Sequence, residues 1–513
     1  MAERSRTEYS IINIFASMGG YALNILLSFI CRVVFVRCLN AEYLGINGMF
    51  SNILSMLSLT ELGIGTAMIY ALYKPVAEND KSKIASYMRI YGIAYKVVGC
   101  VVALLGVLFI PFFDLIINEP ANIPEDIYVL YLLFLFSTAS SYFYSYRSSI
   151  LIANQRNYIV LAISYAMVVI QNAVQIIVLI ITKNYVLYLI VQVAFVLITN
   201  ILISQKAVRD YPYIKDKEAS VLAREEVRGL MKNIKALTVT KLSGILVNNT
   251  DNIVITYFNG LVTTGVVSNY SLFTSMLNSL VNQMFTGLSA SLGNLNAVGD
   301  KERKYKVFKS LNLANFWAYG WATIGIIVLS NDLVEFCFGK EYVMDTGIPI
   351  ILAINFYMLG MQCVVGMYKS TMGLFKQGQY ILFVTAILNL VGDVILGKTY
   401  GVMGIFMATA LARLITNTWY EPYVVYKFGL KQDFKKYIFR YVFFIITLVL
   451  ATSICYGLCA LIRLPVIWRL TIRLLICITI PNAMFFLIFY KWDEFELFID
   501  LIKQVKNKFS KKH

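Results

Sequence analysis

The chain has 513 residues, of which 59% are hydrophobic, and its mean hydropathy of +0.68 excludes an ordinary soluble domain. The formal net charge is +16, but the basic residues gather at both ends and in every second loop. We interpret them as the positive-inside pattern of a membrane protein and exclude nucleic acid as a partner. The only histidine is His513, which excludes Ser-His-Asp triads and H-E-x-x-H zinc sites.

The apolar runs predict an all-α polytopic membrane protein with about 14 transmembrane helices. In chain order we expect them at residues 11–37, 44–73, 85–113, 124–147, 156–182, 185–205, 236–258, 264–292, 306–331, 346–373, 378–397, 402–426, 438–462 and 465–490. The first run is too long for a signal peptide and is expected to remain as the first helix. Asp332 and Glu335 fall in a predicted outer loop, where we expect solvated charges.

The two halves of the chain repeat each other. Ser51 and Ser55 recur 220 residues later as Ser271 and Ser275, Asp80 and Lys81 recur as Asp300 and Lys301, and Arg147 recurs 222 residues later as Lys369. Six spans per half give both halves the same orientation, so we predict two parallel six-helix repeats with two extra helices at the C-terminus. The predicted domains are an N-lobe at 1–205, a cytoplasmic linker at 206–235, a C-lobe at 236–430, and the last two helices with a basic cytoplasmic tail at 431–513.

Four predicted spans carry polar residues along a single helical face. The first of them is the serine stripe, Ser51, Ser55 and Ser58, in span two, and spans one, seven and eight carry similar faces. A polar face in hydrocarbon turns to protein or water, so these faces either line a shared substrate cavity or hold helices together. For the first alternative, the candidate substrate-binding residues are Arg32, Lys241, Arg413, Asn24, Asn248, Asn252, Asn278 and Asn282.

Charged side chains inside a span are costly and call for a reason. Glu61 and Asp251 are the carboxylates best placed to bind a coupling ion, and the sequence does not choose between Na⁺ and H⁺. Arg32 and Asp251 occupy equivalent positions of the two halves. We interpret them as a gate that is ion-paired in an inward-open state and separated in an outward-open state, where Arg32 is free to meet phosphate. We expect Arg473 to reach an interface or a helix contact, and Asp393 to form a local ion pair.

Two short segments resemble a known family. The segments RCLNAEYLG at 37–45 and ELGIG at 61–65 are similar to the start of bacterial polysaccharide-biosynthesis exporters, the O-antigen-type flippases of the multidrug/oligosaccharidyl-lipid/polysaccharide exporter superfamily. The resemblance implies a V-shaped two-lobe transporter that moves undecaprenyl-pyrophosphate-linked oligosaccharide from the cytoplasmic to the outer leaflet by alternating access. In the fourteen-helix relatives, the two extra helices are associated with a groove for the lipid tail.

The resemblance also implies a non-enzymatic protein of the bacterial plasma (inner) membrane. The distribution of the basic residues predicts that both termini are cytoplasmic. We expect a monomer without a cofactor, whose partners are the lipid-linked oligosaccharide, membrane lipids, and polysaccharide polymerase or export proteins. An ion-coupled multidrug or toxin exporter of related fold remains an alternative, and it would favour a cavity rich in aromatics and carboxylates. A membrane polysaccharide polymerase or glycosyltransferase would instead need a large catalytic loop. The chain has no G-x-x-x-x-G-K-[ST] motif, which excludes an ATP motor within it.

The predicted topology can be tested by cysteine labelling in a cysteine-free background. We expect Ser220→Cys, in the predicted linker, to react only with reagent that reaches the cytoplasmic side, because the basic residues concentrate there. Glu119→Cys, in a predicted outer loop, is the matched control and should react from outside. Labelling of position 220 from outside the cell would reject the topology.

Overall fold

The computed structural model describes residues 23–24, 26–58, 64–117, 122–215, 222, 224–231, 234, 250–286, 292, 295–296, 300–374, 377 and 380–497. These residues are mostly helical and include no strand, which confirms the predicted fold class. Nine helices among them are long and apolar enough to cross a membrane. The chain divides into two compact units, unit 1 at Met1–Gly265 and unit 2 at Val266–His513. Much of 206–249 lies outside the described residues, so the predicted domain boundaries stay predictions.

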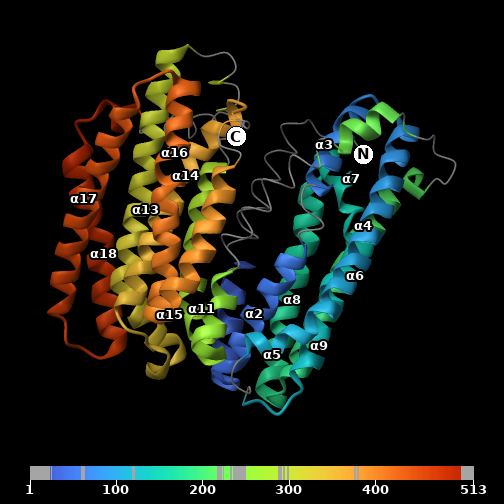
Figure 1. Cartoon of the computed structure of the whole chain (residues 1–513), viewed down its shortest axis with the longest axis horizontal. Helices are drawn as coiled ribbons and strands as arrows, with labels where there is room; N and C mark the ends of the chain where they lie inside the picture. Colours follow the sequence, from blue (N-terminus) through green and yellow to red (C-terminus); the bar gives the residue numbers. More distant parts are fainter. Residues whose placement is uncertain are drawn as a thin grey trace, which may run out of the picture. The chain divides into compact units, whose positions relative to one another are not determined.

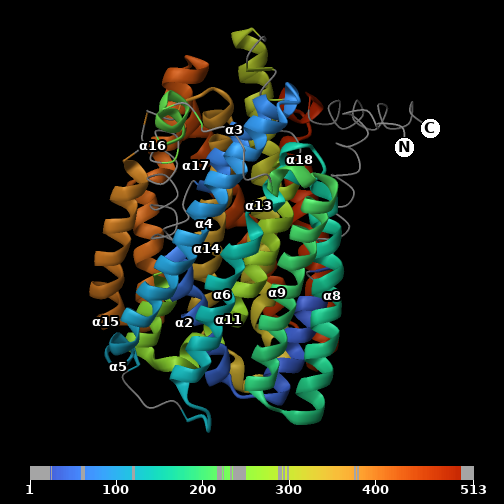
Figure 2. The same cartoon turned by 90° about the vertical axis from the view of Figure 1, so that its right-hand side faces the viewer.

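Unit 1 consists of long helices, of which α6, α8 and α9 lie side by side (Figures 1 and 2). Its elements are α2 (Ala41–Leu57), α3 (Ile64–Ala77), α4 (Lys81–Phe109), the 3-10 turn η2 (Ile110–Phe112), α5 (Phe113–Ile116), α6 (Ile127–Ser145), α7 (Ser148–Ala153), α8 (Asn157–Thr182), α9 (Tyr185–Asp210) and the 3-10 turn η3 (Pro212–Lys215). Residues 26–38, from the predicted first span, are also helical. The predicted span 44–73 corresponds to α2 and α3, on either side of residues that lie outside the described ranges.

Unit 2 contains the longest helix of the structure, α13. Its elements, with α11 shared across the unit boundary, are α11 (Asp251–Thr286), α13 (Lys301–Phe338), the 3-10 turn η4 (Lys340–Tyr342), α14 (Gly347–Thr371), α15 (Ile381–Ile415), α16 (Asn417–Val424), the π-helical turn η5 (Val425–Leu430), α17 (Phe434–Ala460) and α18 (Val466–Phe489). The last two helices match the predicted spans thirteen and fourteen within a few residues. They lie beside α13 at one edge of unit 2 (Figure 1).

The two halves of the repeat share a helix N-cap. Asp80 accepts a hydrogen bond from the backbone N–H of Lys83 at 2.9 Å and thereby caps the N-terminus of α4. Its counterpart Asp300 accepts one from the N–H of Arg303 at 2.7 Å and caps α13. An aspartate at this position satisfies one of the N–H groups that the first turn leaves without a helical partner. The repeated Asp-Lys pair is therefore the same helix start used twice.

Glycines interrupt two of the helices. Gly401 in α15 has φ 56° and ψ −139°, and Gly260 in α11 has φ 79° and ψ 171°, so each helix bends at a backbone conformation that favours glycine. In α15 the two arms lie together, because the hydroxyls of Thr385 and Thr416 are hydrogen-bonded at 2.8 Å. The predicted spans 378–397 and 402–426 thus meet at Gly401.

The interior of unit 2 is formed by α13 and α14. Most of the apolar stretch of each is buried, 61% and 72% of its residues, whereas the other candidate spans bury one third or less. An aromatic cluster attaches α17 and α18 to α13: Phe316 stacks on Phe444 with ring centroids 4.3 Å apart and contacts Phe485 at 5.1 Å. Such pairs add stabilisation beyond the area they bury. The indole N–H of Trp321 also donates to the carbonyl of Cys477 on α18 at 2.8 Å.

Ion clusters secure both ends of this assembly. At one end Asp332 of α13, which is 3% exposed, accepts bonds from Arg469 at 2.9 Å and Arg473 at 2.7 Å of α18. At the other end Glu494, just beyond α18, pairs with Lys309 at 2.7 Å and Arg440 at 3.0 Å. At 1.5 Å per residue, Lys309 and Asp332 lie about 35 Å apart along α13, close to the thickness of a bilayer core. The two clusters therefore fit the two edges of the membrane.

The cluster around Asp332 corrects one prediction and confirms another. Asp332 and Glu335 were expected to be solvated loop charges, but α13 continues to Phe338 and both carboxylates are ion-paired. The prediction was wrong because the helix runs past the end of its apolar stretch. For Arg473 the expected helix contact is confirmed, since it bonds Asp332 and also donates to the carbonyl of Cys459 at 3.0 Å.

The cluster around Glu494 should make the stability of the protein depend on acid pH. Burial alone would raise the pKa of Glu494, but the bond from Lys309 and the charge of Arg440 hold that pKa below its ordinary value. A carboxyl whose pKa is lower in the folded state stabilises the protein fully above its unfolded-state pKa, and this contribution is lost as pH falls through the folded-state pKa. We expect Glu494→Gln to lower the unfolding temperature in detergent at pH 7, and the difference from wild type to shrink as pH falls below about 4.

The matched control is Asp493→Asn, which removes an exposed neighbouring carboxylate. The unfolding temperature of Asp493→Asn should equal that of the wild type at neutral and at acid pH. The opposite result is a difference in unfolding temperature between Glu494→Gln and the wild type that stays constant from neutral to acid pH. That result would show that the charge of Glu494 does not stabilise the fold.

Candidate functional site

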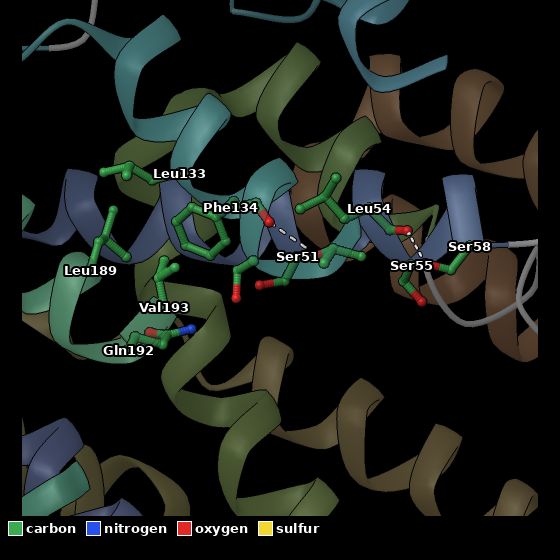
Figure 3. Close-up of a pocket in the computed structure, with 11 residues that line it drawn as sticks. Ser51, Leu54, Ser55, Ser58, Leu133, Phe134, Leu189, Gln192 and Val193 are labelled. Atoms are coloured by element: carbon green, nitrogen blue, oxygen red, sulfur yellow. Dashed lines mark hydrogen bonds between the residues drawn. The ribbon is translucent and has the colours of Figure 1, made fainter. Parts of the chain in front are cut away.

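A pocket with a volume of about 310 Å³ lies within unit 1, between α2, α6 and α9 (Figure 3). It is lined by Ser51, Leu54, Ser55, Ser58, Leu133, Phe134, Ser137, Thr138, Leu189, Gln192 and Val193. Figure 3 shows the serine stripe at the C-terminal part of α2, with Leu133, Phe134 and Leu189 on another side of the pocket. The serine stripe therefore lines a hollow together with polar side chains of two other helices.

The packing of α2 explains why this face is open. Its opposite side is buried, and Phe50 contacts the rings of Phe113 at 5.5 Å and Tyr131 at 5.1 Å. These aromatic contacts hold α2 on α5 and α6, and the helical period then directs Ser51 and Ser55 away from that core. The apolar side of the helix thus determines which way its polar side faces.

The polar groups of the pocket are hydroxyls and one amide. Ser58 donates to the carbonyl of Leu54 at 2.8 Å, and Thr138 donates to that of Phe134 at 3.0 Å. A hydroxyl whose proton is used in this way still has an oxygen that accepts hydrogen bonds, while the Gln192 side chain carries both donors and an acceptor. None of the lining residues is charged. The pocket is therefore suited to a neutral ligand with hydroxyl groups, rather than to an ion.

The polar residues of span eight have another arrangement. Asn278 of α11 accepts hydrogen bonds from the hydroxyl of Tyr319 on α13 at 2.9 Å and from the amide of Asn282 at 3.1 Å. Ser275 donates to the carbonyl of Leu272 in its own helix. Asn278 thus joins α11 to α13, as the packing alternative predicts, while Asn282 supports it within α11. Their predicted part in substrate binding stays a prediction.

Two candidates from span one lie against other helices of unit 1. Asn24 accepts a hydrogen bond from Ser28 at 3.1 Å, and Ser28 in turn accepts one from Asn172 of α8 at 3.5 Å. Arg32 is close enough to Tyr185 and Tyr188 of α9 to interact with them electrostatically. The chain from Asn24 to Asn172 again joins two helices, so both predicted roles of this polar face remain open.

The remaining candidates are spread over several places. Lys241, Asn248 and Glu61 lie outside the described residues. Asp251 and Asn252 begin α11, and Thr256 donates to the backbone carbonyl of Asn252 at 2.7 Å. The gate formed by Arg32 and Asp251 stays a prediction.

Arg413 lies at the end of α15, where it is 9% exposed. It donates to the backbone carbonyl of Asn355 on α14 at 3.3 Å.

A buried polar cluster in unit 2, which we call the α15 cluster, consists of Asn389, Asp393 and Thr409. All three are nearly inaccessible, and the amide of Asn389 donates to Asp393 and to Thr409, each at 3.0 Å. The other side-chain atom of Asn389, its Oδ1, is buried and makes no hydrogen bond with the described residues. The cluster therefore presents a carboxylate, an amide oxygen and a hydroxyl within the fold.

The sequence contained a signal for this cluster. Thr385, Asn389 and Asp393 follow one another at intervals of four residues, which places them on one helical face. The local ion pair expected for Asp393 stays a prediction. In the cluster Asp393 accepts a hydrogen bond from Asn389, whose other partner, Thr409, lies on the other arm of α15. The hairpin at Gly401 brings the two arms together.

Comparison with known proteins agrees with this architecture. The family described as "Polysaccharide biosynthesis protein" matches residues 10–289, which is more than half of the chain. No curated protein matches closely enough to be informative. Among solved structures, the lipid II flippase MurJ in an inward closed conformation has a TM-score of 0.65 at 17% identity, with 94% of this chain and 99% of that chain covered.

Other transporters also share the fold. A mutant of the Vibrio cholerae MATE transporter VcmN has a TM-score of 0.57 at 14% identity, covering 83% of this chain and 99% of that one. A MOP superfamily transporter from Pyrococcus furiosus has a TM-score of 0.54 at 12% identity, covering 84% and 98%. The chain thus has the MurJ- and MATE-like two-lobe transporter fold, and it belongs to the polysaccharide biosynthesis protein family.

Proposed function

We propose that the protein is a flippase that moves an undecaprenyl-pyrophosphate-linked oligosaccharide from the cytoplasmic to the outer leaflet by alternating access. The observation that carries the proposal is the uncharged pocket of unit 1, whose hydroxyls and amide suit a sugar. Sugar recognition agrees with the membership of the polysaccharide biosynthesis family. O-antigen or another surface polysaccharide is the proposed destination of the cargo.

The lining of the pocket favours this function over export of drugs or toxins. A multidrug or toxin exporter of related fold would favour aromatic side chains and carboxylates around its cargo, whereas this pocket has Phe134 as its one aromatic and no carboxylate. We therefore keep the exporter as the second candidate, supported by the likeness to MATE transporters in fold.

The same proposal places the protein in its surroundings. It works as a monomer in the bacterial plasma membrane, with both termini cytoplasmic, and it carries out transport without catalysing a reaction. Its partners are the lipid-linked oligosaccharide, membrane lipids, and polysaccharide polymerase or export proteins. The helices α17 and α18 guide the lipid tail, since they add an apolar surface to the edge of unit 2.

A flipping assay tests the role of the pocket. Purified protein is reconstituted in liposomes with a fluorescent polyprenyl-pyrophosphate sugar, and the rate at which the sugar changes leaflets is measured. We expect Gln192→Leu and Ser137→Ala each to slow flipping roughly 2- to 10-fold, the effect of losing one hydrogen bond. Ser141→Ala on the same helix is the matched control, because Ser141 bonds the carbonyl of Thr138 and does not line the pocket.

Unchanged rates for both pocket variants would remove the pocket from the transport pathway. If wild-type protein flips a cationic drug but no lipid-linked sugar, the exporter is the correct function.

We further propose that the α15 cluster binds the coupling ion, either Na⁺ or H⁺. The supporting observation is the burial of Asp393 beside Asn389 and Thr409 in a membrane helix. Oxygen atoms of this kind bind hard cations, and a carboxylate can alternatively carry a proton. Glu61 and Asp251 remain the other candidates for this role.

Replacing the carboxylate tests the coupling proposal. Asp393→Asn keeps the shape of the side chain and removes its charge, so we expect flipping that no longer responds to an imposed Na⁺ or pH gradient. The control Asp345→Asn changes an exposed carboxylate that caps the start of α14 by accepting the N–H of Gly347 at 2.8 Å. If Asp393→Asn follows the gradient as wild type does, coupling depends on another residue.

A further inference from the structure

The repeat places a tyrosine and a cation at the end of the fourth helix of each half. Tyr146 and Arg147 follow α6 in unit 1, and Tyr368 and Lys369 end α14 in unit 2. In unit 2 the cation is neutralised, because Lys369 bonds Glu421 of α16 at 2.7 Å with both side chains largely buried. The charge of Lys369 is therefore satisfied within the fold.

In unit 1 the corresponding cation meets a hydroxyl instead of a carboxylate. Arg147 donates from Nη1 to the hydroxyl of Ser204 on α9 at 2.7 Å and from Nε to that of Tyr146 at 3.1 Å. No carboxylate among the described residues forms a salt bridge with Arg147. The two halves thus share a cation whose charge is balanced in unit 2 and unbalanced in unit 1.

Nearby carboxylates are already used by other cations. Asp210, less than two turns beyond Ser204 on α9, is shared between Arg156 at 2.8 Å and Lys206 at 2.8 Å. Among the described residues, this group of one carboxylate and two cations carries a net positive charge. Arg147 adds a further positive charge to the same end, and its side chain is partly exposed. This end of unit 1 therefore attracts anions.

We propose that Arg147 is a binding site for a lipid phosphate. A guanidinium has five N–H donors, of which the two hydroxyl bonds use two, so the remaining donors suit the fork-like contact that phosphate oxygens accept. The phosphate belongs either to the pyrophosphate of the proposed cargo or to the headgroup of an anionic membrane lipid. In its first form the inference rests on the proposed function; in its second form it does not.

The test measures lipid binding to the full-length protein in a neutral detergent. The two probes are farnesyl pyrophosphate, which carries no sugar, and dioctanoyl phosphatidylglycerol; dioctanoyl phosphatidylcholine is the neutral control. We expect Arg147→Gln to weaken binding of at least one anionic probe about tenfold, as expected for loss of a charge-assisted contact. Ser204→Glu should do the same with Arg147 in place, because it supplies the carboxylate that unit 2 has.

Matched controls separate this effect from misfolding and from general charge. Arg209→Gln removes an exposed cation from α9, the helix that carries Ser204. This variant should bind both probes as the wild type does. Size exclusion and thermal unfolding establish that each variant is folded. Weakening for farnesyl pyrophosphate alone identifies the cargo as the source of the phosphate, and weakening for phosphatidylglycerol alone identifies the bilayer.

Wild-type affinity in both Arg147→Gln and Ser204→Glu would overturn the site, as would wild-type protein that binds neither anionic probe. Because the assay contains neither a sugar nor a transport step, unchanged flipping rates in the pocket variants would leave its result unaffected. The two proposals can therefore fail separately.

Discussion

The structure depends on one constraint: a polar group within hydrocarbon must find its partner in the protein. Serine and threonine hydroxyls along the spans donate to carbonyls of their own helices, as Thr447 does to Phe443 and Thr323 to Tyr319, each within one turn. Longer polar side chains join helices instead, and the Tyr319–Asn278 bond is one such case. Polar side chains also gather in the pocket of unit 1 and in the α15 cluster of unit 2.

Much of this architecture could be predicted because it follows from local patterns in the sequence. Apolar runs indicated the spans, and the spacing of Asp80 and Asp300 indicated equivalent helix starts, which the two N-caps confirm. The ends of helices were harder to predict. Hydropathy suggested that span nine ends at 331, while α13 continues because Asp332 meets Arg469, a residue 137 positions further along the chain. A contact over that distance leaves no periodic signal in either segment.

The candidate site shows the same division between local and distant information. The helical period of α2 predicts the serine stripe. Ser137 and Gln192 lie on α6 and α9 and are not among the residues that the repeat pairs. The spacing of Asn389 and Asp393 by four residues is a local signal, whereas Thr409 reaches Asn389 only through the hairpin at Gly401. Equivalent positions also acquire different partners: Ser204 for Arg147 and Glu421 for Lys369. Duplication preserved the helices more faithfully than the charges between them.

The two ion clusters of α13 also relate the protein to the membrane around it. Each joins α13 to α18 or to the residues just after it, and the helix between them sets their separation at about 35 Å. In a bilayer of that thickness, both clusters meet the headgroup region. A much thicker bilayer would draw a cluster into the hydrocarbon, and a much thinner one would expose the aromatic cluster around Phe316. The separation of the two ion clusters in unit 2 is therefore matched to the thickness of the bilayer, whatever the cargo.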